Sequence, residues 1–334
     1  MRRLSQQIIH FVLILASIWL PSSLYADKAS GYLVNKLTIK TLPKAYERYE
    51  AQGDFNSLRI PLKRAGKLIL IDAIADSVSG SLILDTGSSG IVLNKIYFRN
   101  GRNSYGQQSG GITGKLDKIE KTKIQKLSFD QLDYTDITVD LADLGHLEKA
   151  RNVKILGFFG LCMFRDFELV LDLKNNVIEL HRLNENGQRI SQQELPIPDL
   201  ELSMYNYNDV FFVEGRITNK RLTFCLDTGA ESNVLDNYLS DKILNTVKIL
   251  RRSTLRGAGH QQTEVFYGLM NEFSLNDKAY PPMQTIITNL SQMSESYGME
   301  IHGMLGCDFF EKGVYYFNLK KNVLGVVFHK QITP

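Results

Sequence analysis

The sequence is short of the residues that mark metal, disulfide and cofactor proteins. Its three cysteines, Cys162, Cys225 and Cys307, are an odd number with no CxxC spacing, which counts against a disulfide framework and a zinc site. The six histidines are scattered without an HExxH motif, so we predict no metal and no cofactor. No long run of like charge is present either, and we expect no nucleic-acid partner.

Tryptophan is the rarest residue, and its one copy lies in an N-terminal segment with the features of a signal peptide. Arg2 and Arg3 precede an apolar run at residues 8–20 that contains Trp19. This run is shorter than the roughly 20 residues that span a bilayer as a helix. We therefore expect residues 1–26 to be a cleaved signal peptide and the protein to be secreted or periplasmic, without stable membrane insertion. An uncleaved N-terminal anchor is the alternative.

What the sequence does contain is enough apolar material for two folded domains. It has 334 residues, of which 43% are hydrophobic and 22% charged, and this composition argues against disorder and coiled coils. The formal net charge of +3 is small for this length and indicates no particular partner.

An internal repeat organises the chain, with four landmarks that recur in the same order in both halves. They are an apolar strand running into Asp-Thr-Gly (82–87 and 224–229), a glycine-bearing turn (110–114 and 257–260), two apolar residues and a glycine (155–157 and 304–306), and a hairpin (169–180 and 315–328). The third pair is further apart than the others, which indicates an insertion at 158–164 in the first half. Repetition at this scale indicates a duplicated domain.

The apolar runs between the landmarks are short, rich in Val, Ile, Leu, Phe and Tyr, and separated by turn residues, which is typical of strands. We therefore predict an all-β protein of two similar lobes. The expected boundaries are 1–26 for the signal peptide, 27–53 for an N-terminal arm or propeptide, 54–183 for the first lobe, 184–199 for a polar linker and 200–334 for the second lobe.

The two Asp-Thr-Gly turns are the candidate functional site. Two carboxylates about 3 Å apart cannot both ionise, so Asp85 and Asp227 would share one proton and activate water without a metal. In each turn the glycine permits a sharp bend, and the threonine hydroxyl can bond across to the other turn. The supporting residues are Thr86, Gly87 and Ser88 in the first half and Thr228, Gly229 and Ala230 in the second.

These turns, at 85–90 and 227–230, resemble the active-site turns of clan AA aspartic peptidases, and the likeness covers roughly residues 58–330. Each half is similar to a retropepsin-like unit, and the tandem arrangement is similar to pepsin. The resemblance implies two β-barrel lobes, a cleft between them, Asp85 and Asp227 as the catalytic pair, and support of the active-site turns by 155–157 and 304–306. Where pepsins usually have an aromatic residue after the serines, this chain has Ile91, and glycine turns occur in both halves, so a fused retropepsin-like pseudo-dimer is favoured.

The glycine turns are candidates for flaps over the substrate, at Gly110, Gly111 and Gly114 in the first half and Gly257 and Gly259 in the second. Ser88 has a hydroxyl that can donate to a carboxylate and lower its pKa, whereas Ala230 has none, so we expect unequal halves and an acidic to mildly acidic pH optimum.

The expected function is an aspartic endopeptidase acting on peptide or protein substrates as a monomer with an intramolecular pseudo-dimer. Three alternatives remain open at this point. The first is a catalytically silent peptide-binding protein on the same fold, and the second is a processing peptidase of narrow specificity. In the third, each half pairs with the same half of another chain.

Overall fold

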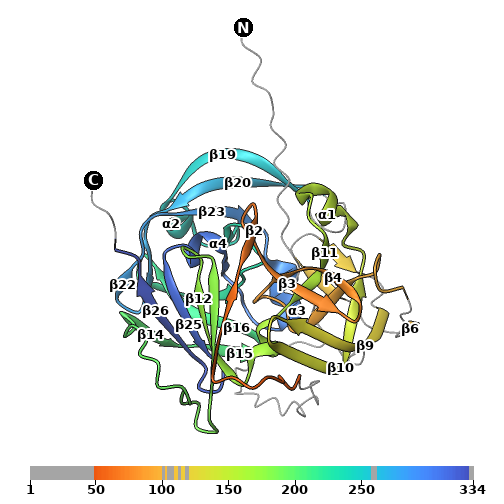
Figure 1. The fold of residues 1–334 in the computed structure, drawn as a ribbon. Coiled ribbons are helices and arrows are strands. Elements are labelled where there is room, and N and C mark those ends of the chain that lie inside the picture. Colours follow the sequence, from red (N-terminus) through yellow and green to blue (C-terminus); the bar gives the residue numbers. More distant parts are fainter. Residues whose placement is uncertain are drawn as a thin grey trace, which may run out of the picture.

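The computed structural model describes residues 49–99, 102–103, 109–111, 114–116, 120–256 and 262–330. Strands dominate this part of the chain, and its longest helices, α1 (Gly145–Arg151) and α3 (Ser291–Tyr297), have seven residues each. The predicted all-β, two-lobed fold class is confirmed. Figure 1 shows the first lobe in orange to yellow-green and the second in green to blue.

The first lobe is a closed β-barrel. The strands of this lobe are β2 (Lys63–Ala65), β3 (Leu68–Ala75), β4 (Val78–Leu84), β5 (Ile91–Asn94), β6 (Arg102–Asn103), β7 (Ser109–Gly111), β8 (Gly114–Leu116), β9 (Glu120–Phe129), β10 (Leu132–Ala142) and β11 (Ile155–Phe159). The order β3-β4-β11-β5-β10-β9 returns to β3 through an antiparallel β3–β9 pairing. The central strands β5 and β11 are buried along their whole length, as expected for strands covered on both faces.

The second lobe repeats this arrangement but stays open. Its strands are β15 (Tyr205–Tyr207), β16 (Val210–Ile217), β17 (Lys220–Leu226), β18 (Asn233–Asp236), β19 (Val247–Arg256), β20 (Gln262–Met270), β21 (Phe273–Leu275), β22 (Lys278–Ala279), β23 (Met283–Thr288) and β24 (Gly303–Leu305). They follow the order β19-β20-β23-β18-β24-β17-β16-β21-β22. Pro281 and Pro282 separate β22 from β23, where the first lobe has the continuous β10. Because proline has no backbone N–H to donate, the ring is interrupted there.

A third sheet joins the lobes. Its six strands are β1 (Ser57–Pro61), β12 (Phe167–Asp172), β13 (Val177–Arg182), β14 (Leu200–Ser203), β25 (Gly313–Asn318) and β26 (Val323–Phe328), in the order β1-β13-β12-β25-β26-β14. The central contact is the antiparallel pair β12–β25, which brings one strand from each half together. The hairpin turns carry Asn176 and Asn322 at equivalent places, both with positive φ, a conformation that asparagine tolerates well.

The strand register corrects one landmark of the repeat. Phe158 and Phe159 pair with β4 as Met304 and Leu305 pair with β17, so the counterpart of Gly306 is Gly160 and not Gly157. The expected insertion after Gly157 is therefore wrong. Both 155–157 and 158–160 read as two apolar residues and a glycine, and only a register shift in β11 distinguishes them.

The remaining elements are short. They are η1 (Leu161–Phe164), α2 (Asp241–Leu244) and α4 (Cys307–Phe310), with η1 and α4 beginning directly after Gly160 and Gly306. The predicted linker at 184–199 contains no helix or strand and connects β13 to β14. Across the described residues no helix has the length and apolarity needed to cross a membrane. Cys162, Cys225 and Cys307 are buried free thiols.

Candidate active site

The two candidate aspartates lie at equivalent strand ends. Asp85 follows β4 and Asp227 follows β17. The backbone N–H of Asp85 donates to the carbonyl oxygen of Phe159, and that of Asp227 donates to Leu305, each over 3.0 Å. Both side chains are fully buried. The strand β11 in one lobe and β24 in the other thus hold the aspartates from behind in the same way.

The two threonines tie the turns together through a reciprocal set of hydrogen bonds. The N–H of Thr86 donates to the hydroxyl of Thr228, and the N–H of Thr228 donates to the hydroxyl of Thr86, each over 3.0 Å. Each hydroxyl then donates across to the other lobe, from Thr86 to the Leu226 carbonyl at 2.8 Å and from Thr228 to the Leu84 carbonyl at 2.7 Å. Four buried bonds therefore fix one turn against the other.

The glycines of the turns are required by close approach. A Cβ at Gly87 would lie 2.7 Å from Cγ of Asp227, and one at Gly229 would lie 2.8 Å from Cγ of Asp85. Neither glycine is among the described glycines with positive φ, so neither is required by a left-handed backbone conformation. Each glycine instead leaves room for the carboxyl group of the opposite lobe.

The two carboxyl groups accept backbone hydrogen bonds on their inner oxygens. Oδ1 of Asp85 accepts from Gly87 at 3.0 Å, whereas Oδ1 of Asp227 accepts from Gly229 at 2.9 Å and from Ala230 at 3.2 Å. Oδ2 of each aspartate is buried and receives no hydrogen bond from a described residue outside the pair. These two outer oxygens are therefore the ones free to share a proton or to bind a reactant.

Burial and mutual repulsion keep this pair partly protonated. Burial, followed by the charge of Asp227 and a hydrogen bond with it, raises the pKa of Asp85 well above its usual range. Burial raises the pKa of Asp227 to about 6, against the lowering effect of hydrogen bonds from Asp85 and from the N–H groups of Gly229 and Ala230. The two carboxyl groups therefore titrate as a pair that shares one proton.

The halves are unequal, but not for the expected reason. The hydroxyl of Ser88 donates to the carbonyl oxygen of Gly90 at 3.2 Å, and its backbone N–H, not its hydroxyl, lowers the pKa of Asp85. Each carboxyl group has two backbone hydrogen bonds that lower its pKa, from Gly87 and Ser88 at Asp85 and from Gly229 and Ala230 at Asp227. What differs is the contact between the two aspartates, which raises the pKa of Asp85 and lowers that of Asp227.

The flap candidates fall partly inside the described residues. Gly110, Gly111 and Gly114 form the β7–β8 hairpin, in which Gly111 pairs with Gly114, and β7 lies against helix α3 of the second lobe. Gly257 and Gly259 lie outside the described residues. The strands that lead to them, β19 and β20, form a long ribbon that arches over the top of the molecule toward α1 (Figure 1).

Two neighbours of the site were missed by sequence reasoning. Tyr297, at the end of α3, is buried against the rings of Tyr207 and Phe212. Burial, followed by nearby negative charges that include those of both aspartates, raises the pKa of Tyr297. Glu231, next after Ala230, forms an ion pair with Arg151 of the first lobe. Neither carries a sequence signal, because each is defined by contacts between distant segments.

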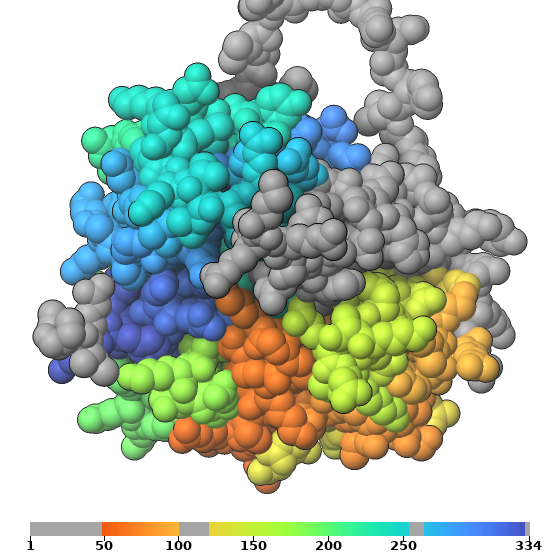
Figure 2. Space-filling model, turned by 90° about the horizontal axis from the view of Figure 1, so that it is seen from above, coloured from red at the N-terminus to blue at the C-terminus, as the bar shows by residue number. Residues whose placement is uncertain are grey.

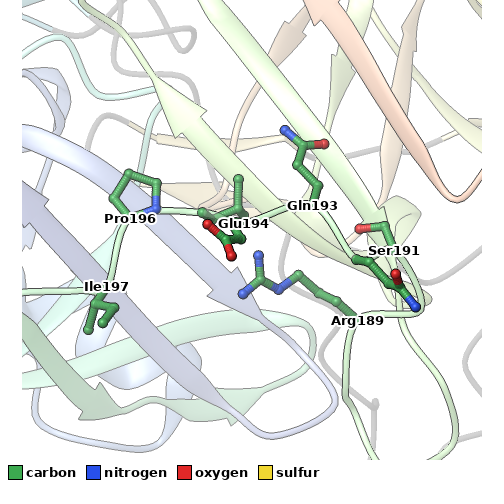
Figure 3. Close-up of a pocket in the computed structure, with 8 residues that line it drawn as sticks. Arg189, Ser191, Gln193, Glu194, Pro196 and Ile197 are labelled. Carbon is green, nitrogen blue, oxygen red and sulfur yellow. The ribbon is translucent and has the colours of Figure 1, made fainter.

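A cavity of about 800 Å³ lies elsewhere, along the linker. Figure 3 shows Arg189 extended beside Glu194, with Pro196 and Ile197 at one end. The residues that line it come from the single segment 189–197 and include neither aspartate turn. We assign it no part in the site. Among the described residues no cluster of three potential metal ligands occurs.

Comparison with known families bears on the second lobe. Residues 213–309, which include Asp227, β24 and most of α4, match the family described as aspartyl protease. The second lobe is thus similar to the aspartyl protease family over those residues. The match is confined to one lobe, and the first lobe repeats the same turn, strand pairing and glycine contacts.

Among solved structures, a retropepsin-like aspartic protease from Rickettsia conorii aligns with a TM-score of 0.27 and 14% identity over 41% of this chain and 96% of its own. The aspartic proteinase from Irpex lacteus aligns with a TM-score of 0.46 and 11% identity over 83% of this chain and 98% of its own. Similarity at this level says nothing about the activity of this chain. No curated protein matches the chain.

Proposed function

We propose that the chain is an aspartic endopeptidase that hydrolyses peptide bonds with a water molecule activated between Asp85 and Asp227. The observation that carries this proposal is the pairing of two buried carboxyl groups by the reciprocal Thr86–Thr228 bonds. A protein that only binds peptides has no need of two facing carboxyl groups with raised pKa values.

The unequal pKa values divide the roles. Asp227, with a pKa of about 6, is the carboxylate that takes a proton from water. Asp85, whose pKa is raised well above its usual range, holds the proton that is passed to the carbonyl oxygen of the peptide. Collapse of the resulting tetrahedral species breaks the C–N bond. Asp227 gives the proton that it took from water to the leaving nitrogen, and a hydroxyl of the tetrahedral carbon returns a proton to Asp85 as the new carboxyl group forms. No covalent enzyme intermediate is required.

The substrate class follows from the strands around the site. An extended peptide can add its backbone to strand edges, and the β7–β8 hairpin and the β19–β20 ribbon are the hairpins that carry the flap candidates. We propose peptide or protein segments in extended conformation as substrates. Cleavage of a mixed peptide library by the wild type, with none by Asp227→Asn, would support this function, and no cleavage at any pH between 3 and 8 would contradict it.

A silent binder and a narrow-specificity peptidase predict different results in the same library. The binder would retain peptides without shortening them, and Asp227→Asn would retain them equally well. A processing peptidase would cleave a small number of sequences and leave the rest intact. Mass spectrometry of both the bound and the released peptides separates the three outcomes.

The described end of the N-terminal arm packs beside the site. Gln52 forms a β-bridge with Asp133, and the hydroxyl of Tyr49 donates to the carbonyl oxygen of Thr138 over 3.5 Å. Both aspartates are fully buried. We propose that residues 27–53 restrict access as a propeptide. Cleavage that is faster after their removal would support this, and unchanged cleavage would contradict it.

We also propose that the protein is secreted or periplasmic through residues 1–26 and acts as a monomer. Trp19 is the one tryptophan of the sequence, so a processed chain has no tryptophan fluorescence. The intact mass of the protein recovered from its native compartment tests this directly. A mass that includes residues 1–26 would indicate the N-terminal anchor instead.

A further inference from the structure

Most ion pairs between the described residues of the two lobes have the same polarity. In four pairs the basic residue comes from the first lobe and the acidic residue from the second, and these are Arg64–Glu311, Lys67–Asp308, Arg151–Glu231 and Arg165–Asp209. One further pair between lobes, Lys320–Asp166 at 3.6 Å, has the opposite polarity, and it lies beside β12 and β25 at the shared sheet.

In three of these pairs the acidic side chain is largely shielded from water, whereas Glu311 is 42% exposed. Nζ of Lys67 lies 2.6 Å from Oδ1 of Asp308, and the exposed fractions of the two side chains are 28% and 10%. The other oxygen of Asp308 accepts a hydrogen bond from Ser232 at 3.0 Å. In the Arg165–Asp209 pair, the aspartate side chain is 8% exposed. Reduced access to solvent strengthens both attraction and repulsion between charges.

The internal repeat places opposite charges at equivalent positions. Lys67 follows Gly66 in the β2–β3 turn, and Asp209 follows Asn208 in the β15–β16 turn, 142 residues later. Each turn reaches the short helix of the opposite lobe. Lys67 reaches α4, and Asp209 reaches Arg165, directly after η1.

The residues that follow the two short helices also carry opposite charges at equivalent positions of the repeat. Arg165 directly follows η1, and Glu311 directly follows α4, 146 residues later. Hence a pair of two first lobes would bring Lys67 of one copy toward Arg165 of the other. A pair of two second lobes would bring Asp209 toward Glu311 and Asp308. Both alternatives place like charges together.

We propose that these charges decide which lobes pair, so that a first lobe accepts a second lobe and neither accepts its own copy. The residues that set this preference are Lys67 and Arg165 on the first lobe and Asp209, Asp308 and Glu311 on the second. In a symmetric dimer each lobe contacts a copy of itself, whereas in this duplicated chain each lobe contacts a lobe of opposite charge. This inference does not depend on catalysis.

The test uses three full-length variants. Arg165→Asp places two acidic residues together within one chain, and at the same time makes two first lobes complementary through Lys67 and the new aspartate. Arg165→Asp/Asp209→Lys restores the attraction within one chain. Arg59→Asp is the matched control, because Arg59 is 66% exposed and its ionic partner, Glu179, belongs to the same lobe.

We expect Arg165→Asp to form dimers as the protein concentration rises, with a dimer fraction about tenfold above wild type in sedimentation experiments. The double variant should recover the wild-type monomer fraction, and Arg59→Asp should keep it. If Arg165→Asp does not fold, folding of the double variant supports the proposal, and its failure to fold contradicts it. A monomeric Arg165→Asp with wild-type stability, or a double variant no closer to wild type than the single one, also overturns it.

Discussion

The backbone N–H of Thr86 and that of Thr228 each donate to the side-chain hydroxyl of the other residue over 3.0 Å. This exchange joins segments 142 residues apart and holds the two buried carboxyl groups at one place in the molecule. The lobes meet again at the shared sheet and at the hairpin ion pairs. The site between the lobes is therefore fixed on several sides.

The first prediction concerns this exchange. Thr228→Val removes a hydroxyl that accepts from Thr86 and donates to Leu84, leaving both partners buried and unpaired. We expect a loss of about 2–4 kcal/mol in the free energy of unfolding, measured by denaturant titration. Thr228→Ser keeps the hydroxyl and serves as the control, with an expected loss of about 1 kcal/mol or less. Equal stability of the two variants would contradict the role assigned to the hydroxyl.

The second prediction concerns the room that glycine leaves for the opposite carboxyl group. Gly87→Ala places a Cβ 2.7 Å from Cγ of Asp227, so the two turns must separate. We expect a destabilisation of about 1–3 kcal/mol. Gly90→Ala is the matched change, because its Cβ would lie 3.8 Å from the nearest atom. Unfolding of Gly87→Ala at the same denaturant concentration as Gly90→Ala would argue against the close approach.

The third prediction is a dependence of stability on pH. Asp227 has a pKa of about 6 in the folded protein, raised from an ordinary 3.8, so the folded state binds its proton more tightly than the unfolded state. Stability conferred by this group is greatest below pH 4 and is lost as the pH rises through 6. For one carboxyl group the loss is roughly 3 kcal/mol at neutral pH.

Removal of the titrating groups isolates this effect. Asp85→Asn/Asp227→Asn should unfold at higher temperature than wild type at pH 7, and the difference should shrink toward pH 4. Thermal unfolding at several pH values measures it. A difference that does not change between pH 4 and pH 7 would show that the pair is not protonated in the folded protein.

The fourth prediction concerns the pH dependence of cleavage. The proposed base must be ionised while Asp85 keeps its proton, so the acidic limb of kcat/KM should lie near the pKa of about 6 of Asp227. The expected optimum is thus at the mild end of the acidic range. If kcat/KM still increases as the pH is lowered to 4, the pKa of the base is lower in the active form, and the pair is then less buried there than in this structure.

Much of the fold could be predicted because the repeat is written in short local patterns. Residue type and spacing are enough to predict the two Asp-Thr-Gly turns and the hairpins with Asn176 and Asn322. The choice between Gly157 and Gly160 could not be made in this way. Both follow two apolar residues, and the pairing of Phe159 with Leu84 on β4 decides it.

The features that sequence could not provide depend on contacts between distant segments. The opposite charges of Lys67 and Asp209 can be assigned a role only in the fold, which places Asp308 beside Lys67 and Arg165 beside Asp209. The raised pKa values of the two aspartates likewise depend on burial and on the contact between their carboxyl groups, which only the fold brings together. At Ser88 the hydroxyl donates to the carbonyl oxygen of Gly90, and the backbone N–H is the group that lowers the pKa of Asp85.

The most direct test of the central claim compares peptide cleavage by wild type, Asp85→Asn and Asp227→Asn at matched concentrations across pH 4–8. A pair shared between the lobes of one chain predicts that either substitution alone abolishes cleavage. If like lobes instead paired between chains, each substitution would remove only one of two independent sites. About half of the wild-type activity would then remain in each single variant, and that result would contradict the account.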